Sequence, residues 1–232
     1  MKALITQREA VDQHSVAIDL LESTYVLFFE NLGISLRPVS NFHRDKKLIF
    51  KDAYDLAILT GGGYIESKYY DKPHSYQLQT NRDITEKKVI SEARSRKIPI
   101  LAICRAMQLI NGLYGGLTTR LDSLRVNREV RVDHPVLLGN EKIHVNNYHT
   151  SGILLTQLAS NLIPIALDTE NEIVEGFYHK DDRILGIQWH PERDFKNPES
   201  YFKSENLITS FIENGGELDE MYYISRRSGN PT

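Results

Sequence analysis

One short stretch of the chain, IPILAICRAMQLING at residues 98–112, limits what the protein can fold into. It opens with a fully apolar run, Ile98–Ile103, which is typical of a strand buried on both faces. From Met107 the sequence is typical of a helix, so Cys104 falls on a strand-to-helix turn. Strands of this kind belong to parallel sheets that are covered by helices. The stretch therefore predicts an α/β fold in which a sharp turn presents Cys104 above the sheet.

Apolar runs alternate with helical patterns throughout the first half of the chain. Strands are predicted at residues 2–6, 34–39 and 54–60, and helices at residues 25–32 and 83–97. Asp83 and Glu86 match a capping box, which places the start of the second helix near Asp83. Gly33 is placed to end the first helix, and Pro38 indicates a strand end or an edge strand.

After Gly115 the pattern changes to short β-like segments. They lie at residues 130–132, 136–138, 142–145, 163–166, 173–178 and 184–189. The last two flank a charged turn and predict a hairpin, and a helix is predicted over residues 205–214. The whole pattern predicts a three-layer α/β sandwich with a central, mostly parallel, flavodoxin-like sheet and a small antiparallel β segment. We expect one domain over residues 1–214 and a partly mobile C-terminal tail over residues 215–232.

Composition restricts the class of protein. The 232 residues carry a formal net charge of −3, which argues against nucleic acid as a general partner. The single cysteine excludes an internal disulfide framework and a multi-cysteine zinc site, and it fits a reducing compartment. The N-terminus turns polar after five residues, and the longest apolar runs are too short to cross a membrane. We expect a cytoplasmic protein that needs no membrane, metal or cofactor.

The predicted position of Cys104 favours the thiolate. A thiol at the N-terminal end of a helix feels the positive end of the helix dipole, which lowers the pKa of the thiol. A lone cysteine is nevertheless most often a small buried hydrophobic residue. The interpretation of Cys104 as a nucleophile therefore depends on the groups that lie beside it.

A second group of reactive side chains lies in the segment IQWHPE at residues 187–192. In an extended segment, His190 and Glu192 would project to the same side. A carboxylate beside an imidazole fixes its tautomer and stabilises the imidazolium. Pro191 cannot donate to a sheet, so we expect the pair at a strand end, where sites assemble in parallel α/β sheets. The alternative is a solvated surface turn.

The glycine run Gly61–Gly63 follows directly after the predicted strand at residues 54–60. No Gly-Lys-Ser/Thr follows it, so it is not a P-loop. A turn of this kind can present a backbone N–H toward a substrate, and together with the Arg105 N–H it would form an oxyanion hole. The alternative is a flexible turn without a chemical role.

In this order, the segments ILTGGGY, PILAICRAMQLIN and GIQWHPE resemble the class I glutamine amidotransferase-like superfamily. Within it they look like the γ-glutamyl hydrolase branch, of the peptidase C26 type. The resemblance implies that Cys104 is the nucleophile, that His190 is the general base and acid, and that Glu192 orients His190. It also implies that the N–H groups of Gly62 and Arg105 form the oxyanion hole.

The same resemblance implies contacts with the substrate. Gln108 matches a position that contacts the glutamyl group. The segment that holds Asn147, Tyr148 and His149 aligns with one that reads the amino-acid end of the substrate. Considered without the resemblance, this segment is also compatible with a polar turn.

The chain departs from the family pattern at two places. Relatives often carry glycine on both sides of the elbow, where this chain has Ala102 and Ala106. Alanine allows less backbone freedom, so we expect an elbow with tighter steric limits. Relatives often carry His and Gln where this chain has Thr150 and Ser151, which affects substrate contacts and leaves the triad intact.

The resemblance implies a cysteine-dependent hydrolase that cleaves a γ-glutamyl C–N bond and releases glutamate through a γ-glutamyl thioester. It implies a small-molecule substrate with a nucleotide-linked amidate as its leaving group, of the kind used in capsule modification, and no obligatory synthetase partner. A diphosphate leaving group would favour nearby cations and aromatic rings. Candidates near predicted strand ends are Arg8, Lys68, Tyr69, Tyr70 and Arg105.

Other functions remain open from the sequence. The chain could be a glutaminase that supplies ammonia to a separate synthetase as one of its subunits, or a hydrolase of another γ-glutamyl amine. It could be a binding domain that has kept the scaffold without catalysis, or a peptidase on the same kind of scaffold. Hydrolysis of free glutamine separates the glutaminase from the γ-glutamyl hydrolase, and the thiol reactivity of Cys104 separates an enzyme from a binding domain.

Overall fold

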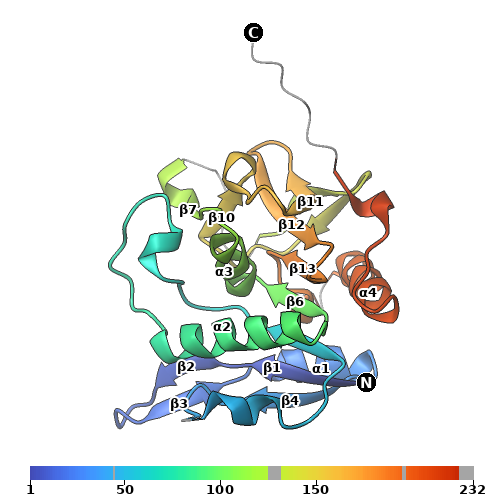
Figure 1. Ribbon diagram of the computed structural model, residues 1–232. Coiled ribbons are helices and arrows are strands. Elements are labelled where there is room, and N and C mark those ends of the chain that lie inside the picture. Colours follow the sequence, from blue (N-terminus) through green and yellow to red (C-terminus); the bar gives the residue numbers. More distant parts are fainter. Residues whose placement is uncertain (44, 125–131, 195–196, 225–232) are drawn as a thin grey trace.

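A mixed β-sheet with helices on both faces forms the body of the protein in the computed structural model (Figure 1). The structure describes residues 1–43, 45–124, 132–194 and 197–224. Over these residues the main path of an 11-stranded sheet runs in the order β4-β1-β5-β6-β13-β12-β11-β8-β9, while β10 pairs with β12 and β7.

The first half of the sheet is parallel. Its strands are β4 (Ser35–Val39), β1 (Lys2–Thr6), β5 (Leu56–Leu59), β6 (Ile100–Ile103) and β13 (Ile184–Ile187). Each strand pairs in parallel with its neighbour in this order, so their C-terminal ends meet at one edge. The glycine run after β5, Cys104 after β6 and His190 after β13 therefore come together at this edge.

The second half of the sheet is antiparallel. Its strands are β12 (Ile173–His179), β11 (Ile163–Asp168), β8 (His134–Leu138), β9 (Glu141–Val145), β10 (Ser151–Leu154) and β7 (Thr119–Arg120). β12 and β13 form the predicted hairpin. A separate two-stranded sheet consists of β2 (Arg8–Val11) and β3 (Ala17–Leu20).

Helices form the two outer layers. They are α1 (Ser23–Asn31), α2 (Thr80–Ser95), α3 (Arg105–Leu113) and α4 (Pro198–Glu213). Side chains of β6 alternate between the layers: Leu101 and Ile103 join a core cluster with α1 and α4, whereas Ile100 and Ala102 join one with α2 and α3. This alternation makes a three-layer sandwich, which confirms the predicted fold class.

Short 3₁₀ helices connect several of these elements. They are η1 (Lys46–Phe50), η2 (Ser67–Tyr69), η3 (Leu121–Leu124), η4 (Leu155–Gln157), η5 (Pro191–Arg193) and η6 (Glu220–Tyr222). The η6 segment belongs to the last described part of the chain. Leu218 is buried there and the Tyr223 ring stacks on Tyr178, so residues 215–224 pack on the sheet. The final residues, 225–232, lie outside the described residues.

The predicted capping box on α2 is wrong. The helix begins at Thr80, with Gln79 as its N-cap, so Asp83 and Glu86 lie within the helix. Their carboxylates accept hydrogen bonds from Arg105, and this buried pairing explains the spacing that resembled a cap. Gly33, at φ +69°, ends α1, and β4 with Pro38 is the edge strand, as predicted.

Several other elements differ from the predicted ones. The strands β2, β3, β7 and β10 were not predicted, and α4 begins at Pro198 rather than at residue 205. Asn197 caps α4 by accepting a hydrogen bond from the Ser200 N–H. Of the strand predicted at residues 130–132, residues 130 and 131 lie outside the described residues.

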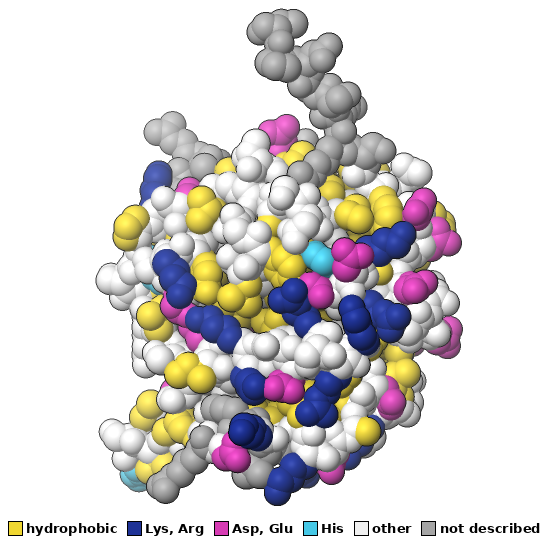
Figure 2. Space-filling model, viewed as in Figure 1, with side chains coloured by type: hydrophobic (Ala, Val, Ile, Leu, Met, Phe, Trp, Pro, Cys, Tyr) yellow, Lys and Arg dark blue, Asp and Glu magenta, His cyan; other side chains and the backbone are white. Residues whose placement is uncertain are grey.

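The described surface shows mixed charge. On the face drawn in Figure 2, Lys and Arg side chains are interspersed with Asp and Glu. Within the part of the chain that the structure describes, no helix has the length and apolar character that crossing a membrane requires.

Candidate active site

Cys104 occupies a sharp turn between β6 and α3. Its backbone has φ +53° and ψ −105°, a conformation that costs a non-glycine residue free energy and is concentrated at functional sites. The Cys104 N–H donates to the Ile187 carbonyl oxygen at 2.7 Å, which ties the turn to β13. The elbow thus forms with Ala102 and Ala106 on either side, both fully buried.

His190 and Glu192 meet Cys104 from the end of β13. The His190 Nδ1 lies 2.6 Å from the Glu192 Oε1. The His190 Nε2 and the Cys104 Cβ face each other across the glycine turn, since each lies 3.2 Å from the position of a Cβ added to Gly61. The sequence spacing suggested that His190 and Glu192 lie in an extended segment. The structure differs, because η5 begins at Pro191. The 3₁₀ turn folds the carboxylate back onto the imidazole and produces the same contact.

The electrostatics of this group favour an ion pair. Burial acts to raise the pKa of the Cys104 thiol, but the charge of His190 and the Gly62 N–H outweigh it and lower the pKa. Burial acts to lower the pKa of His190, but Glu192 and Cys104 outweigh it and raise the pKa to about 10. At neutral pH the geometry therefore favours a thiolate beside an imidazolium.

The glycine run lies directly against this pair. A Cβ added to Gly61 would lie 2.5 Å from the His190 Cε1 and 3.2 Å from the Cys104 Cβ, so a side chain at residue 61 cannot be accommodated without displacement. Gly62 has φ +86°, which favours glycine, and its N–H points at the Cys104 thiol. The Tyr25 hydroxyl accepts a hydrogen bond from the Gly61 N–H at 3.0 Å.

A buried arginine of α2 holds the carbonyl side of the same turn. Arg82 is fully buried and donates to the carbonyl oxygens of Thr60, Gly61 and Gly62 at 2.5, 3.0 and 2.8 Å. Its Nε donates to the Glu86 Oε1 at 2.8 Å. Because the carbonyl oxygens are fixed toward Arg82, the Gly62 N–H is held toward Cys104.

Arg105 contributes its backbone and its side chain in different directions. It is the first residue of α3, so its N–H is a helix-terminal donor beside Cys104. Its guanidinium points into the protein, where it pairs with Asp83 and with the Glu86 Oε2 at 2.5 Å. The side chain is therefore unavailable for a diphosphate group, contrary to the candidate contact inferred from the sequence.

A series of hydrogen bonds between buried side chains holds the backbone of His190 in place. Asn146 Nδ2 donates to the His190 carbonyl oxygen at 2.7 Å, and Asn146 Oδ1 accepts from the His190 N–H at 3.0 Å. Asp194 Oδ1 accepts from Asn146 Nδ2 at 2.6 Å, and Asp194 Oδ2 accepts from Ser200 Oγ at 2.7 Å. The backbone of His190 is thereby fixed relative to β9 and α4.

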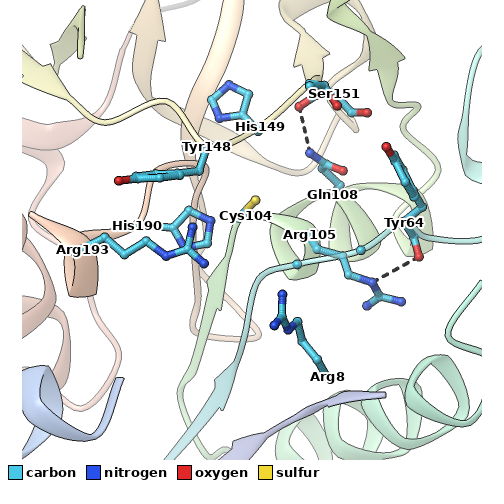
Figure 3. Close-up of a pocket in the computed structure, with 13 residues that line it drawn as sticks. Arg8, Tyr64, Cys104, Arg105, Gln108, Tyr148, His149, Ser151, His190 and Arg193 are labelled. Atoms are coloured by element: carbon cyan, nitrogen blue, oxygen red, sulfur yellow. Dashed lines mark hydrogen bonds between the residues drawn. The ribbon is translucent and has the colours of Figure 1, made fainter. Parts of the chain in front are cut away.

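A cavity of about 250 Å³ opens at Cys104 (Figure 3). It is lined by Arg8, Gly62, Gly63, Tyr64, Cys104, Arg105, Gln108, Tyr148, His149, Thr150, Ser151, His190 and Arg193. Of the substrate contacts predicted from the sequence, Gln108, Tyr148 and His149 line it. Asn147 does not: it is 1% exposed and its Oδ1 lies 3.5 Å from the His149 backbone nitrogen.

Two glutamines connect the cavity wall to Cys104. Gln108 Nε2 donates to the Ser151 carbonyl oxygen at 3.0 Å and to the Gln188 Oε1 at 3.1 Å. Gln188 Nε2 in turn lies 3.4 Å from the Cys104 Sγ. Gln188 belongs to the IQWHPE segment, but nothing in its sequence position indicated that its side chain would reach Cys104.

The cations at the cavity differ from those proposed from the sequence. Arg8 lines the cavity, as suggested, and Arg193, directly after Glu192, also lines it. The cavity lining does not include Lys68, Tyr69 or Tyr70. Lys68 and Tyr69 belong to η2, and Tyr70 follows it directly. In the described part of the chain, no cluster of three His, Cys, Asp or Glu side chains is arranged to hold a metal ion.

The fold places the chain among known proteins of one class. A candidate GMP synthase subunit from Thermoplasma acidophilum matches with a TM-score of 0.60 and 19% identity, covering 94% of this chain and 98% of that one. A glutamine amidotransferase of Thermotoga maritima matches with a TM-score of 0.54 and 16% identity, covering 93% and 90%. The protein thus has the fold of class I glutamine amidotransferases.

The sequence comparison identifies the family. The family model for peptidase C26 matches residues 5–192, and the chain belongs to the peptidase C26 family. The NtpR protein of Enterococcus hirae is 36% identical over 166 residues, covering 61% of this chain and 68% of NtpR. The γ-glutamyl-CDP-amidate hydrolase of Campylobacter jejuni is 30% identical over 168 residues, covering 72% and 77%.

Proposed function

We propose that the protein is a cysteine-dependent hydrolase that cleaves a γ-glutamyl C–N bond and releases glutamate. Membership of the peptidase C26 family supports hydrolysis of this bond type. The observation that carries the proposal is geometric: Cys104 and His190 lie side by side at one cavity, and the His190 Nδ1 lies 2.6 Å from the Glu192 Oε1. In this proposal Cys104 is the nucleophile, His190 is the general acid and base, and Glu192 orients His190.

The first half of the reaction forms a thioester. The Cys104 thiolate attacks the γ-carbonyl carbon, a C–S bond forms, and the carbonyl oxygen becomes an oxyanion. The N–H groups of Gly62 and Arg105 stabilise this oxyanion, and such a donor contributes about 2.7–4 kcal/mol to lowering a barrier. The His190 imidazolium gives its Nε2 proton to the leaving nitrogen as the C–N bond breaks.

The second half of the reaction restores the enzyme. Neutral His190 takes a proton from a water molecule, whose oxygen attacks the thioester carbonyl. The C–S bond breaks, glutamate leaves, and the thiolate–imidazolium pair is regenerated. The sum is one γ-glutamyl compound and one water converted to glutamate and one free amine or amidate.

We further propose γ-glutamyl-CDP-amidate as the substrate, giving cytidine diphosphoramidate for capsule polysaccharide modification in the cytoplasm. The similarity to the Campylobacter jejuni enzyme supports this choice. Release of ammonia from glutamine for a separate synthetase is the alternative that the class I fold keeps open.

Glutamate release from a series of substrates tests both proposals. Wild-type protein is given γ-glutamyl-CDP-amidate, γ-glutamyl-4-nitroanilide and free glutamine, with Cys104→Ser as the inactive variant and Arg37→Gln, on exposed β4, as the matched control. We expect turnover of N-substituted compounds that exceeds turnover of glutamine and is lost in Cys104→Ser. Preferential hydrolysis of glutamine would favour the glutaminase, and activity retained by Cys104→Ser would contradict the mechanism.

A further inference from the structure

The proposed mechanism fixes the direction in which the leaving group departs. His190 must give its proton to the leaving nitrogen, so the leaving group lies on the His190 side of Cys104. In Figure 3, Arg193 and Tyr148 lie on that side, whereas Gln108, Ser151 and Tyr64 lie on the other side of Cys104. A role for side chains on the His190 side in binding the leaving group therefore rests on the proposed hydrolase function.

Two arginines from distant parts of the chain meet on one carboxylate beside the cavity. Arg193 Nη2 lies 2.8 and 2.7 Å from the two carboxylate oxygens of Glu22, and Arg193 Nε lies 3.1 Å from Oε2. Arg8 Nη1 lies 3.7 Å from the Glu22 Oε1, beyond hydrogen-bond distance. The Arg193 guanidinium also lies over the Tyr148 ring, 4.7 Å from its centroid, so its position is fixed from two directions.

Glu22 neutralises only part of the positive charge of the two arginines. Glu22 is shared by both guanidiniums, and Glu192, 3.8 Å from Arg193 Nε, is already engaged with the His190 Nδ1. None of the described residues that line the cavity is acidic. Arg8, Arg193 and Glu22 together carry a net charge of about +1, whereas the thiolate, the imidazolium and Glu192 together carry about −1. The site is therefore polarised, with its positive charge on the two arginines.

The Arg8 side chain lies on the glycine turn beside Cys104 and is only weakly held by Glu22. Its stem packs on the glycine turn, since a Cβ added to Gly62 would lie 2.5 Å from the Arg8 Cδ. Its side chain is 38% exposed, and the weak contact with Glu22 leaves the guanidinium able to turn toward a bound anion. Arg193, at 22% exposed and bidentate on Glu22, serves as the fixed partner.

We propose that Arg8 and Arg193 form a subsite for an anionic group on the leaving side of the substrate. Guanidinium groups bind carboxylates and phosphates through paired, charge-assisted hydrogen bonds, so both anions fit this chemistry. The subsite selects γ-glutamyl compounds whose amine or amidate product carries a negative charge. Glu22 holds the Arg193 guanidinium in place through its two carboxylate oxygens.

Binding of leaving-group products tests the subsite without catalysis. The probes are 4-aminophenyl phosphate and 4-aminobenzoate, with aniline as the neutral reference, measured by calorimetry with the wild-type protein. We expect the anionic probes to bind more tightly than aniline, and their Kd to rise about tenfold in Arg8→Gln and in Arg193→Gln. The Kd of the anions should also rise with salt concentration, because the charges are partly exposed.

Kinetics on matched substrates extends the test to the reaction. The kcat/KM ratio of γ-glutamyl-3-carboxy-4-nitroanilide to γ-glutamyl-4-nitroanilide should exceed one in the wild type and fall toward one in Arg8→Gln. Arg37→Gln should keep the wild-type ratio. γ-Glutamyl-4-aminophenyl phosphate gives the phosphate arm, and the larger of the two ratios identifies the preferred anion.

The outcomes of the two measurements are distinct. Equal binding of anionic and neutral probes by the wild type, or a preference that survives in both Arg8→Gln and Arg193→Gln, overturns the subsite. Salt-dependent binding of the anions that is weakened in both variants supports the subsite, even if no glutamate is released. Glutamate release failing for every substrate would instead overturn the proposed hydrolase activity.

Discussion

The Asn146 side chain makes two hydrogen bonds with the backbone of His190: it donates to the carbonyl oxygen at 2.7 Å and accepts from the N–H at 3.0 Å. Asn146 is buried and does not line the cavity, so it acts on a substrate only through His190. In the proposed mechanism, Asn146 is therefore a positioning residue. Its partner Asp194 extends the support to α4 through Ser200.

Asn146→Ala should lower kcat about tenfold and change KM little. The two lost hydrogen bonds contribute about 1 kcal/mol each, and His190 would lose its fixed position relative to Cys104. Steady-state kinetics with γ-glutamyl-4-nitroanilide measures both constants. Asn161→Ala, at an exposed asparagine, is the control and should behave as the wild type. A rise in KM with unchanged kcat would contradict the positioning role.

Gly61→Ala should lower kcat by about a hundredfold while the protein remains folded. The new Cβ would lie 2.5 Å from the His190 Cε1, and a displacement of about 1 Å in a reacting group has an effect of that size. Gly33→Ala is the matched control, because no atom lies within 4 Å of the added Cβ. Its φ of +69° costs stability by about 1 kcal/mol and should leave kcat unchanged. Equal losses of kcat in both variants would refute the steric explanation.

The pH dependence of Cys104 alkylation should reveal the thiolate–imidazolium pair. The lowered pKa of Cys104 increases the thiolate fraction at neutral pH, and the pKa of His190 is raised to about 10. Since the two groups are coupled, both apparent pKa values belong to the pair. Iodoacetamide should therefore react rapidly at pH 7.

Glu192→Gln tests the cause of the raised pKa of His190. Removing the carboxylate takes away the charge that stabilises the imidazolium, so the upper limit of the kcat/KM profile should move to lower pH. The position of Cys104 in the turn does not depend on Glu192. An upper limit that stays unchanged in this variant would show that another group sets it.

The sequence predicted the parts of the site that depend on local pattern. The apolar run before Cys104 and the helix after it are enough to predict the elbow, and His190 with Glu192 follows a second strand. Arg82 could not be predicted, because the carbonyl oxygens it binds lie 20 to 22 residues away and come together only in the folded sheet.

Other parts of the structure were predicted wrongly or not at all for similar physical reasons. Asp83 and Glu86 have the spacing of a cap, but tertiary pairing with Arg105 uses both carboxylates. The hairpin of β2 and β3 is short and half-exposed, so it lacks an apolar run that would predict it. Its position nevertheless brings Arg8 to the cavity, near Arg193 from the other end of the chain.

Asp194 should make stability depend on pH between about 4 and 6. Burial raises the pKa of Asp194 to about 6, more than the hydrogen bonds from Ser200 and Asn146 lower it. The folded state therefore binds the proton more tightly than the unfolded state, and the free energy of unfolding falls as pH rises through this window, by about 3 kcal/mol at most.

Urea unfolding of wild type and Asp194→Asn at several pH values measures this effect. Asparagine keeps the shape of the side chain and cannot titrate, so the other acidic groups cancel in the comparison. The wild type should lose stability relative to the variant as pH rises from 4 to 6. A constant difference between the two proteins over this range would refute the assignment to Asp194.

The covalent state of Cys104 during turnover tests the central claim most directly. Wild-type protein is mixed with γ-glutamyl-4-nitroanilide, quenched in acid within milliseconds to seconds, and analysed by intact-protein and peptide mass spectrometry. We predict a single γ-glutamyl group on Cys104 that hydroxylamine removes and that is absent in Cys104→Ser. Glutamate release at the full wild-type rate with no adduct on Cys104, or with the adduct on another residue, would contradict the account.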